Sequence, residues 1–379
     1  MKALILYAYP PEPDGLSMQG HFLYKGFLEN GEEAVPCHPE AGLQKEYYIK
    51  KFKPQVAIGI GYWANVPILV NSFKNTNIIP VPWFNADGWV ANYHDVLSKL
   101  PLVMTTSDWV KQTYARDGVN TKNFSPAHIG IDTNVSKPMP KEEIQKIREM
   151  LGVKKDEKMI LTIGGDVTSK GAQEMLEALG QIDKEFKNWK YICKTWPSDS
   201  AKDHHGEELE IMESFGIDKS KVVFLEGCYS QEFMPCLINA CDIYAAPSRL
   251  EGFGMIQVEA MACGKPVISI DGMGPKETII HGKTGFLARI SKTVDLEEEW
   301  VYPWMGFSEK KRIKFDKPKV FAYRANVDDL TRDTLKLLQD DHLREQMGKN
   351  AREHAVKNFH YTVTSKKIIN LIKHKLDLE

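Results

Sequence analysis

The chain has 379 residues, which is too long for one compact core and predicts two domains. Hydrophobic residues make up 42% and charged residues 26% of it, the balance of an ordinary soluble globular protein. The formal net charge of -2 gives no general attraction to nucleic acid or to an anionic membrane. We therefore expect no nucleic-acid partner, whereas a local peripheral contact with a membrane stays open.

The cysteines and the amino terminus bear on the compartment. The six cysteines contain no CxxC pair and no Cys/His spacing typical of zinc ligands, so we expect reduced thiols. The first apolar run ends at Pro10 and Pro11, which is too short for a signal peptide. No stretch approaches the roughly 20 apolar residues of a membrane-spanning helix. These features predict a cytoplasmic protein.

The first half alternates short apolar runs with helix-like stretches. Continuous apolar runs suit parallel strands that are buried on both faces. Ser107 is a suitable N-cap for the second helix and Gly118 a suitable stop. The expected strands cover residues 3–7, 56–61, 78–82 and 102–106, and the expected helices cover 18–30 and 108–117.

The alternation restarts after a segment, 134–141, that contains Pro138 and Pro140 and is typical of a linker. Two successive strand–helix series predict two doubly wound, Rossmann-like α/β domains. Further strands are expected at 159–163, 191–194, 222–225, 243–246 and 266–270, with helices at 172–179, 327–338, 341–359 and 364–376. We assign residues 1–135 to the N-terminal domain, 136–358 to the C-terminal domain, and 359–379 to a terminal helix that packs back on the N-terminal domain.

Residues 291–323 break this rhythm, because they are rich in lysine, glutamate and aromatic residues. We interpret them as an insertion in the C-terminal domain. A surface excursion packed on the domain, a lid and a partner contact all stay open.

The most informative segment is 247–269, in which a strand leads through Glu251-Gly252-Phe253-Gly254 into a helix from about Met255. Glycines at such a turn allow close backbone approach, and the free amides and dipole of a helix start suit a diphosphate. Glu259 lies inside an otherwise apolar helix, where a carboxylate needs a partner. A ribose diol would supply one.

This segment resembles the E-x7-E motif of retaining glycosyltransferases of family 4, the group 1 glycosyltransferases, which have the GT-B fold. The resemblance extends over most of the chain. It implies two Rossmann-like domains facing a central cleft, with a UDP- or GDP-sugar as donor and no further cofactor. It also implies that Gly252, Phe253, Gly254, Met255 and Glu259 bind the donor, and that Glu251 is catalytic.

Upstream, residues 163–171 resemble the family's loop whose lysine meets the donor pyrophosphate. That resemblance assigns Lys170 to donor binding and catalysis, and Gly165 to the donor site. The family's usual arginine is replaced by Gly165, so Arg249, Lys194 or a residue of the N-terminal domain could supply the second cation.

On the acceptor side, Gly15 resembles the remaining glycine of the family's first loop, which backs onto the donor phosphates. The family's usual histidine is absent after residues 78–82. Asn85 or Asp87 could take its sugar-contacting role, and we assign Asn85 as catalytic. Trp83 and Trp89 could stack on an acceptor, although packing in the core is the simpler interpretation.

The resemblance implies sugar transfer with retention of anomeric configuration and without a metal ion. No DxD pair follows a strand, and His204 and His205 lack a third ligand at suitable spacing. The alternatives are a nucleotide-sugar-binding protein without transferase activity and a nucleotide-sugar epimerase on the same fold. A Rossmann oxidoreductase is disfavoured, because no G-x-G-x-x-G follows the first strand. The acceptor and the oligomeric state are not readable from the sequence.

Overall fold

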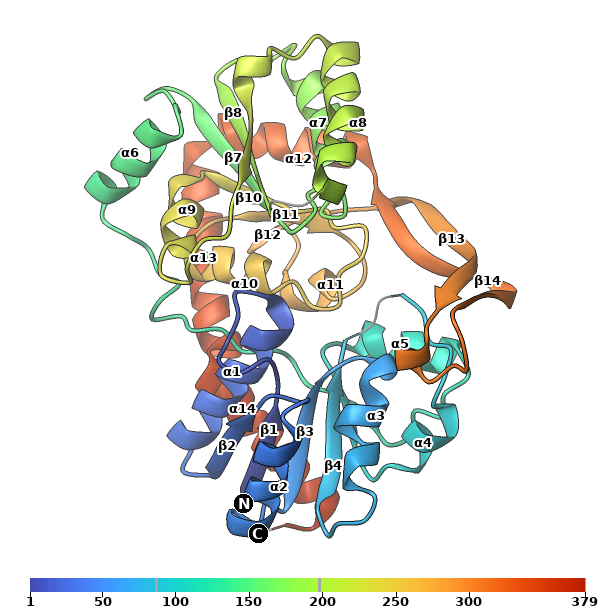
Figure 1. Cartoon of the computed structure of the whole chain (residues 1–379). Helices are drawn as coiled ribbons and strands as arrows, with labels where there is room; N and C mark the ends of the chain where they lie inside the picture. The colour runs from blue at the N-terminus through green and yellow to red at the C-terminus, as the bar shows by residue number, and fades with distance from the viewer. Residues whose placement is uncertain (86–87, 197–198, 379) are drawn as a thin grey trace. The chain divides into compact units, whose positions relative to one another are not determined.

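A computed structural model describes residues 1–85, 88–196 and 199–378, and within residues 199–205 it describes the backbone alone (Figure 1). The chain forms two compact units. Unit 1 comprises residues 1–132, 295–321 and 358–379, and unit 2 comprises residues 133–294 and 322–357. The first boundary falls close to the expected one at residue 135.

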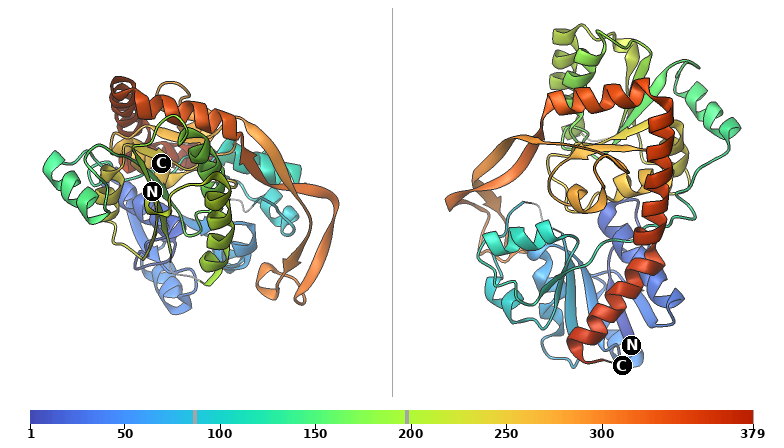
Figure 2. Two further views of the ribbon diagram at one scale, coloured as in Figure 1. Left: turned by 90° about the horizontal axis from the view of Figure 1, so that it is seen from above. Right: turned by 180° about the vertical axis from the view of Figure 1, so that it is seen from behind.

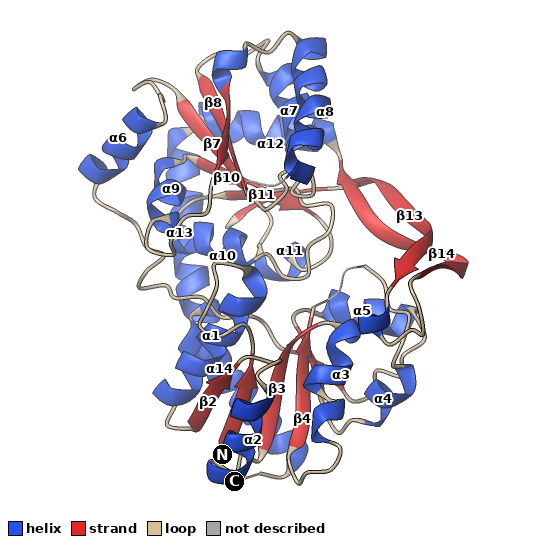
Figure 3. Cartoon of the chain, viewed as in Figure 1, coloured by secondary structure: helices blue, strands red, loops and turns tan. Residues whose placement is uncertain are grey.

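Unit 1 is built on a parallel sheet of six strands in the order β2-β1-β3-β4-β5-β6. Chain order reverses between β1 and β3, so the loops after these two strands flank the switch point of the sheet. Figure 3 separates the strands from the helices that flank them. The strands are β1 (Lys2–Leu6), β2 (Glu33–Cys37), β3 (Val56–Gly61), β4 (Ile79–Phe84), β5 (Val103–Thr105) and β6 (Phe124–Pro126).

The helices of unit 1 cover this sheet. Asp14 caps α1 by accepting hydrogen bonds from the amides of Leu16 and Ser17, and Ser107 caps α5 as expected. The last helix, α14, packs against α1, and the right-hand view of Figure 2 shows it in red. The helices are α1 (Gly15–Glu29), α2 (Gly42–Lys51), α3 (Val66–Leu69), α4 (His94–Lys99), α5 (Asp108–Arg116) and α14 (Tyr361–Leu376).

The segment interpreted as an insertion is a long two-stranded hairpin of β13 (Ile290–Val301) and β14 (Lys311–Ala325). Its distal residues, 295–321, belong to unit 1 rather than wholly to the C-terminal domain. Val301 and Met305 are buried in the core of unit 1. The ring of Phe315 lies 5.7 Å from that of Trp89. The apolar side chains of the hairpin thus complete a core that residues 1–132 begin.

Unit 2 contains a second parallel sheet of six strands in the order β12-β11-β10-β7-β8-β9. The chain runs outward from β7 through β8 and β9 and then returns to the other side of β7 with β10. The switch point therefore lies between β7 and β10. The strands are β7 (Lys158–Ile163), β8 (Trp189–Thr195), β9 (Val222–Glu226), β10 (Ile243–Ala245), β11 (Val267–Ile270) and β12 (Gly285–Ala288).

Helices complete unit 2, with α7 packed against both α8 and α12. They are α6 (Lys141–Met150), α7 (Ala172–Ile182), α8 (Asp199–Phe215), α9 (Met234–Ala240), α10 (Met255–Ala262), α11 (Pro275–Thr278), α12 (Val327–Gln339) and α13 (Asp341–Phe359). In the part of the chain that the structure describes, no helix has the length and apolar character needed to cross a bilayer.

Candidate functional site

Two loops meet at the switch point of unit 2, one after β7 (residues 164–171) and one after β10 (residues 246–254). The amide of Arg249 donates a hydrogen bond to the carbonyl of Ser169, at 2.8 Å. Gly171 has a φ of +82°, and a Cβ added there would collide with the carbonyl oxygen of Pro247. Only glycine combines this left-handed conformation with so close an approach. The two loops are thereby held together.

This contact brings Lys170 and Glu251 side by side. The ammonium of Lys170 lies 2.7 Å from Oε2 of Glu251, and Oε1 of Glu251 accepts a hydrogen bond of 3.0 Å from the amide of Gly254. Both side chains are largely but not fully buried, at 25% and 18% exposure. An accessible cation therefore stands at the mouth of the turn that precedes α10.

The turn itself has the geometry of an anion cradle. Gly254 precedes α10 with a φ of +93° and provides no side-chain cap, so the first amides of the helix face outward without one. Phe253 is buried, and a Cβ on Gly274 would lie 2.5 Å from backbone atoms of Gly252 and Phe253. The backbone of Gly274 thus packs closely against the turn. Met255 is the first residue of the helix.

Glu259 lies on α10, just beyond its first turn, and is partly buried. Burial raises the pKa of its carboxyl from 4.5 to about 7, because a low-dielectric surrounding disfavours the charged form. Among the described residues, none makes a hydrogen bond or ion pair with this carboxyl. A ligand with hydroxyl donors would satisfy it.

The cation missing at Gly165 is not supplied by Arg249. The guanidinium of Arg249 is engaged by Glu174, at 3.0 Å from Nε, and by Gln173, at 2.7 Å from Nη2. Gly165 instead faces the indole of Trp196, 3.5 Å from the position that a Cβ would take. Trp196 is not among the site residues predicted from the sequence, although its place directly after an expected strand is a usable signal.

The remaining predicted residues belong to unit 1. Gly15 begins α1, directly after its cap. The side-chain amide of Asn85 donates to Oε1 of Gln19 at 3.1 Å and accepts from the hydroxyl of Thr106 at 2.6 Å. Both ends of this amide are thus engaged inside the unit, which suits a positioning role better than direct sugar contact. Asp87 lies outside the described residues.

The two candidate stacking tryptophans are core residues. Trp83 is 1% exposed and Trp89 is 6% exposed. The indole of Trp83 donates a hydrogen bond to the carbonyl of Ala127, and Trp89 packs edge-on against Trp63. Packing, the simpler interpretation, accounts for both.

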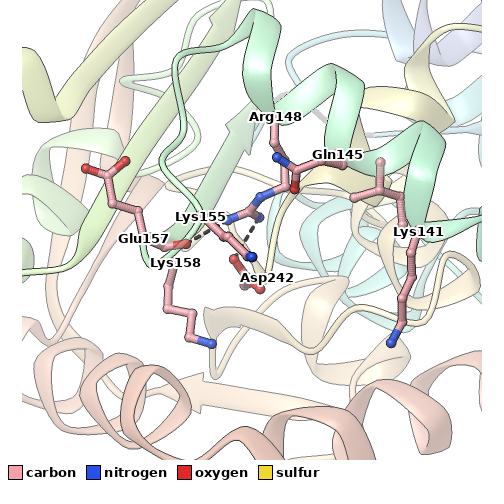
Figure 4. Close-up of a pocket in the computed structure, with 8 residues that line it drawn as sticks. Lys141, Gln145, Arg148, Lys155, Glu157, Lys158 and Asp242 are labelled. Atoms are coloured by element: carbon pink, nitrogen blue, oxygen red, sulfur yellow. Dashed lines mark hydrogen bonds and ion pairs between the residues drawn. The ribbon is translucent and has the colours of Figure 1, made fainter.

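A surface pocket of about 420 Å³ lies at the opposite end of the unit 2 sheet, where β7 begins (Figure 4). Its central side chain, Arg148, binds the carboxylate of Asp242 at 2.9 Å and the carbonyl of Glu157 at 2.6 Å. These bonds fasten α6 to the sheet. The pocket is structural in character and remote from the carboxyl ends of the strands, where ligands bind in such sheets.

Among the described residues, no group of three or more His, Cys, Asp or Glu side chains is placed so that it could hold a metal ion. The side chains of His204 and His205 lie outside the described residues.

The fold is that of the GT-B proteins. The solved structure of a glycosyltransferase from Rickettsia africae matches with a TM-score of 0.76 over 100% of this chain and 99% of its own, at 16% identity. Sucrose-phosphate synthase from Thermosynechococcus elongatus matches with a TM-score of 0.74 over 100% of both chains, at 16% identity. Anabaena HepE, solved in complex with UDP and glucose, matches with a TM-score of 0.73 over 99% of this chain and 100% of its own, also at 16% identity.

Residues 143–299 match the family model of glycosyl transferases group 1. The resemblance found in the sequence is thereby confirmed. Among curated proteins, D-inositol 3-phosphate glycosyltransferase of Mycobacterium tuberculosis is 27% identical over 186 residues, which cover 49% of this chain and 37% of that protein. The match thus spans little more than a third of the length of this relative.

Proposed function

We propose that the protein is a retaining glycosyltransferase that moves a sugar from a UDP- or GDP-sugar to an acceptor without a metal ion. The observation that carries this proposal is the arrangement of Lys170, Glu251 and Gly254 at the start of α10. It brings a cation from the loop after β7 next to the carboxylate and the free helix amides of the turn before α10. These are the groups that a departing nucleoside diphosphate and a sugar require.

The chemistry follows from the charges that form during transfer. As the bond between the anomeric carbon and the diphosphate breaks, negative charge grows on the leaving phosphate. The ammonium of Lys170 and the amides at the start of α10 stabilise this charge, and this is the task that a metal ion would otherwise perform. The sugar gains oxocarbenium character, which nearby carboxylate dipoles stabilise. Glu251 and Glu259 hold hydroxyl groups of the donor.

The proposal has support from proteins of similar fold and family. HepE was solved with UDP and with UDP-glucose, and the matched curated relative is named as a glycosyltransferase. Lys170, Glu251 and Glu259 lie within the matched residues 143–299. The acceptor is left undefined, because the matched proteins differ in what they glycosylate.

Incubation of the purified protein with radiolabelled UDP- and GDP-sugars tests this function. We expect release of the nucleoside diphosphate, and the release should persist in EDTA. Anomeric configuration in the product, read by NMR, tests retention. Tight binding of a nucleotide sugar with no hydrolysis or transfer to any acceptor would support the binding-protein alternative instead. Conversion of the donor into an epimeric nucleotide sugar would support the epimerase.

A further inference from the structure

Lys194 is a buried cation at the carboxyl end of β8. Its side chain is 3% exposed, which is rare for lysine. The ammonium lies 5.9 Å from the ring centre of Trp196 and 5.7 Å from that of Tyr229. The two aromatic faces attract the cation and shield it from water. Trp196 itself is 40% exposed, so the outer surface of this small cluster is accessible.

Among the side chains that the structure describes, no carboxylate pairs with Lys194. Its ammonium has no hydrogen bond or ion pair with the side chains described in residues 1–85, 88–196 and 206–378, or with the described backbone. Burial accordingly lowers the pKa of Lys194. An ammonium removed from water without an anion destabilises a fold, and two cation–π contacts offset only part of that cost. The arrangement is therefore expected of a site that an anionic ligand completes.

The position of Lys194 relates it to the donor site of the same unit. The carbonyl of Lys194 accepts a hydrogen bond of 3.0 Å from the amide of Gly164. A Cβ on Gly164 would lie 2.6 Å from Cγ of Lys170, and one on Gly165 would lie 3.5 Å from Trp196. The side chain of Lys170 thus packs over Gly164, and the indole of Trp196 lies over Gly165. Lys194 stands one strand away, about 5 Å along the sheet.

We propose that Lys194 is a second phosphate-binding cation of this unit, held between Trp196 and Tyr229 to meet the diphosphate of the bound nucleotide. The proposal rests on the proposed function and deepens it. The guanidinium of Arg249 is already bound to Glu174 and Gln173. Lys194, at the carboxyl end of β8, lacks a counter-ion among the described side chains.

The test replaces Lys194 with methionine, which keeps an unbranched apolar stem between the two rings and removes the charge. Titration calorimetry measures the affinity for UDP and GDP and for the nucleosides uridine and guanosine. We expect Lys194→Met to lower the affinity for the nucleoside diphosphates by about tenfold and to leave the affinity for the nucleosides unchanged. Without ligand, the variant should melt at a temperature equal to or higher than the parent, because a buried unpaired charge is gone.

Lys190→Met provides the matched control. Lys190 lies on the same strand at its other end and donates to the carbonyl of Gly152 at 3.0 Å, so its replacement should not change nucleotide affinity. Lys194→Arg should retain most of the affinity, which also excludes a folding defect as the cause.

Unchanged diphosphate affinity in Lys194→Met would overturn the proposal. An equal loss for diphosphate and nucleoside would also overturn it, since the lysine would then contact the base. If the parent transfers sugar while Lys194→Met binds diphosphate normally, this inference fails and the proposed function stands. If the parent binds no nucleotide, both fail.

Discussion

Replacing Glu259 with glutamine should stabilise the free protein and weaken the nucleotide complex. The carboxyl has a pKa of about 7 against an ordinary value of 4.5. One pKa unit corresponds to about 1.4 kcal/mol, so full ionisation of Glu259 costs the ligand-free fold about 3 kcal/mol. Glutamine has nearly the same shape and carries no charge at any pH.

The sign of the pH dependence follows from the raised pKa. Between pH 4.5 and 7 the folded state keeps a proton that the unfolded state has lost, so Glu259 makes stability fall as the pH rises through this window. Above about pH 7 the penalty is complete. The gain in stability of Glu259→Gln over the parent should therefore be small at pH 4.5 and reach about 3 kcal/mol at pH 8.5.

Urea unfolding at these two pH values measures the effect, and calorimetry with UDP or GDP measures the opposite effect on binding. A ribose diol donates more strongly to a carboxylate than to a neutral amide, so the variant should bind about tenfold more weakly at pH 8.5. The parent's affinity should rise with pH toward 8 and the variant's should not. An equal stability difference at both pH values, or undiminished affinity, would refute the role given to Glu259.

Three further changes test the site and its frame. Lys170→Met should lower turnover by about a hundredfold and donor affinity by less. The control Lys276→Met removes an exposed lysine paired with Asp271 and should change neither quantity. Equal losses of turnover and donor affinity in Lys170→Met would argue against a role of Lys170 in the transition state. Gly171→Ala should cost about 2 kcal/mol or more, because it adds a clash with Pro247 to a strained φ. Gly216 also has a positive φ, +65°, but a Cβ added there would meet nothing within 4 Å. Gly216→Ala should therefore lower the free energy of unfolding by only about 1 kcal/mol in the same urea titration. Similar losses for Gly171→Ala and Gly216→Ala would show that the contact with Pro247 is unimportant. Asp329→Asn should cost about 2 kcal/mol near neutral pH, because Arg289 and Arg332 both bind this buried carboxylate at 2.7 Å. The hydrogen bond from Arg289 lowers the pKa of Asp329, so this difference should shrink as the pH falls below 3.8, and a pH-independent difference would contradict it.

Most buried strands of both sheets were predictable because parallel strands covered on both faces are continuously apolar, although the buried β12 was not among those expected. β3 has the expected bounds, and β7 differs by one residue. Strands β2 and β6 were missed for physical reasons. β2 begins with an exposed glutamate and contains a proline, and β6 has only three residues. The hairpin was missed because most of β13 is exposed, so its sequence lacks the apolar pattern of a core strand.

The sequence suggested residues for a candidate donor site, but it did not reveal the contacts among them. Lys170 and Glu251 stand 81 residues apart, and their pairing depends on Gly171 fitting under Pro247, which no local pattern reveals. Lys194 was one of several candidates for the missing cation. Choosing it required the contacts of Arg249 with Glu174 and the two rings around the Lys194 ammonium, both of which arise only in the folded unit.

The composition of unit 1 has a consequence for the order in which the protein is made. Residues 1–132 leave the ribosome before unit 2, yet the core they begin lacks Val301, Met305 and the buried face of α14 until those later residues have been made. Unit 2 has its whole sheet by Ala288 and its last helices by residue 357. The N-terminal unit is therefore started first and completed last, and a nascent chain halted before β13 exposes the apolar surface around Trp89 to chaperones.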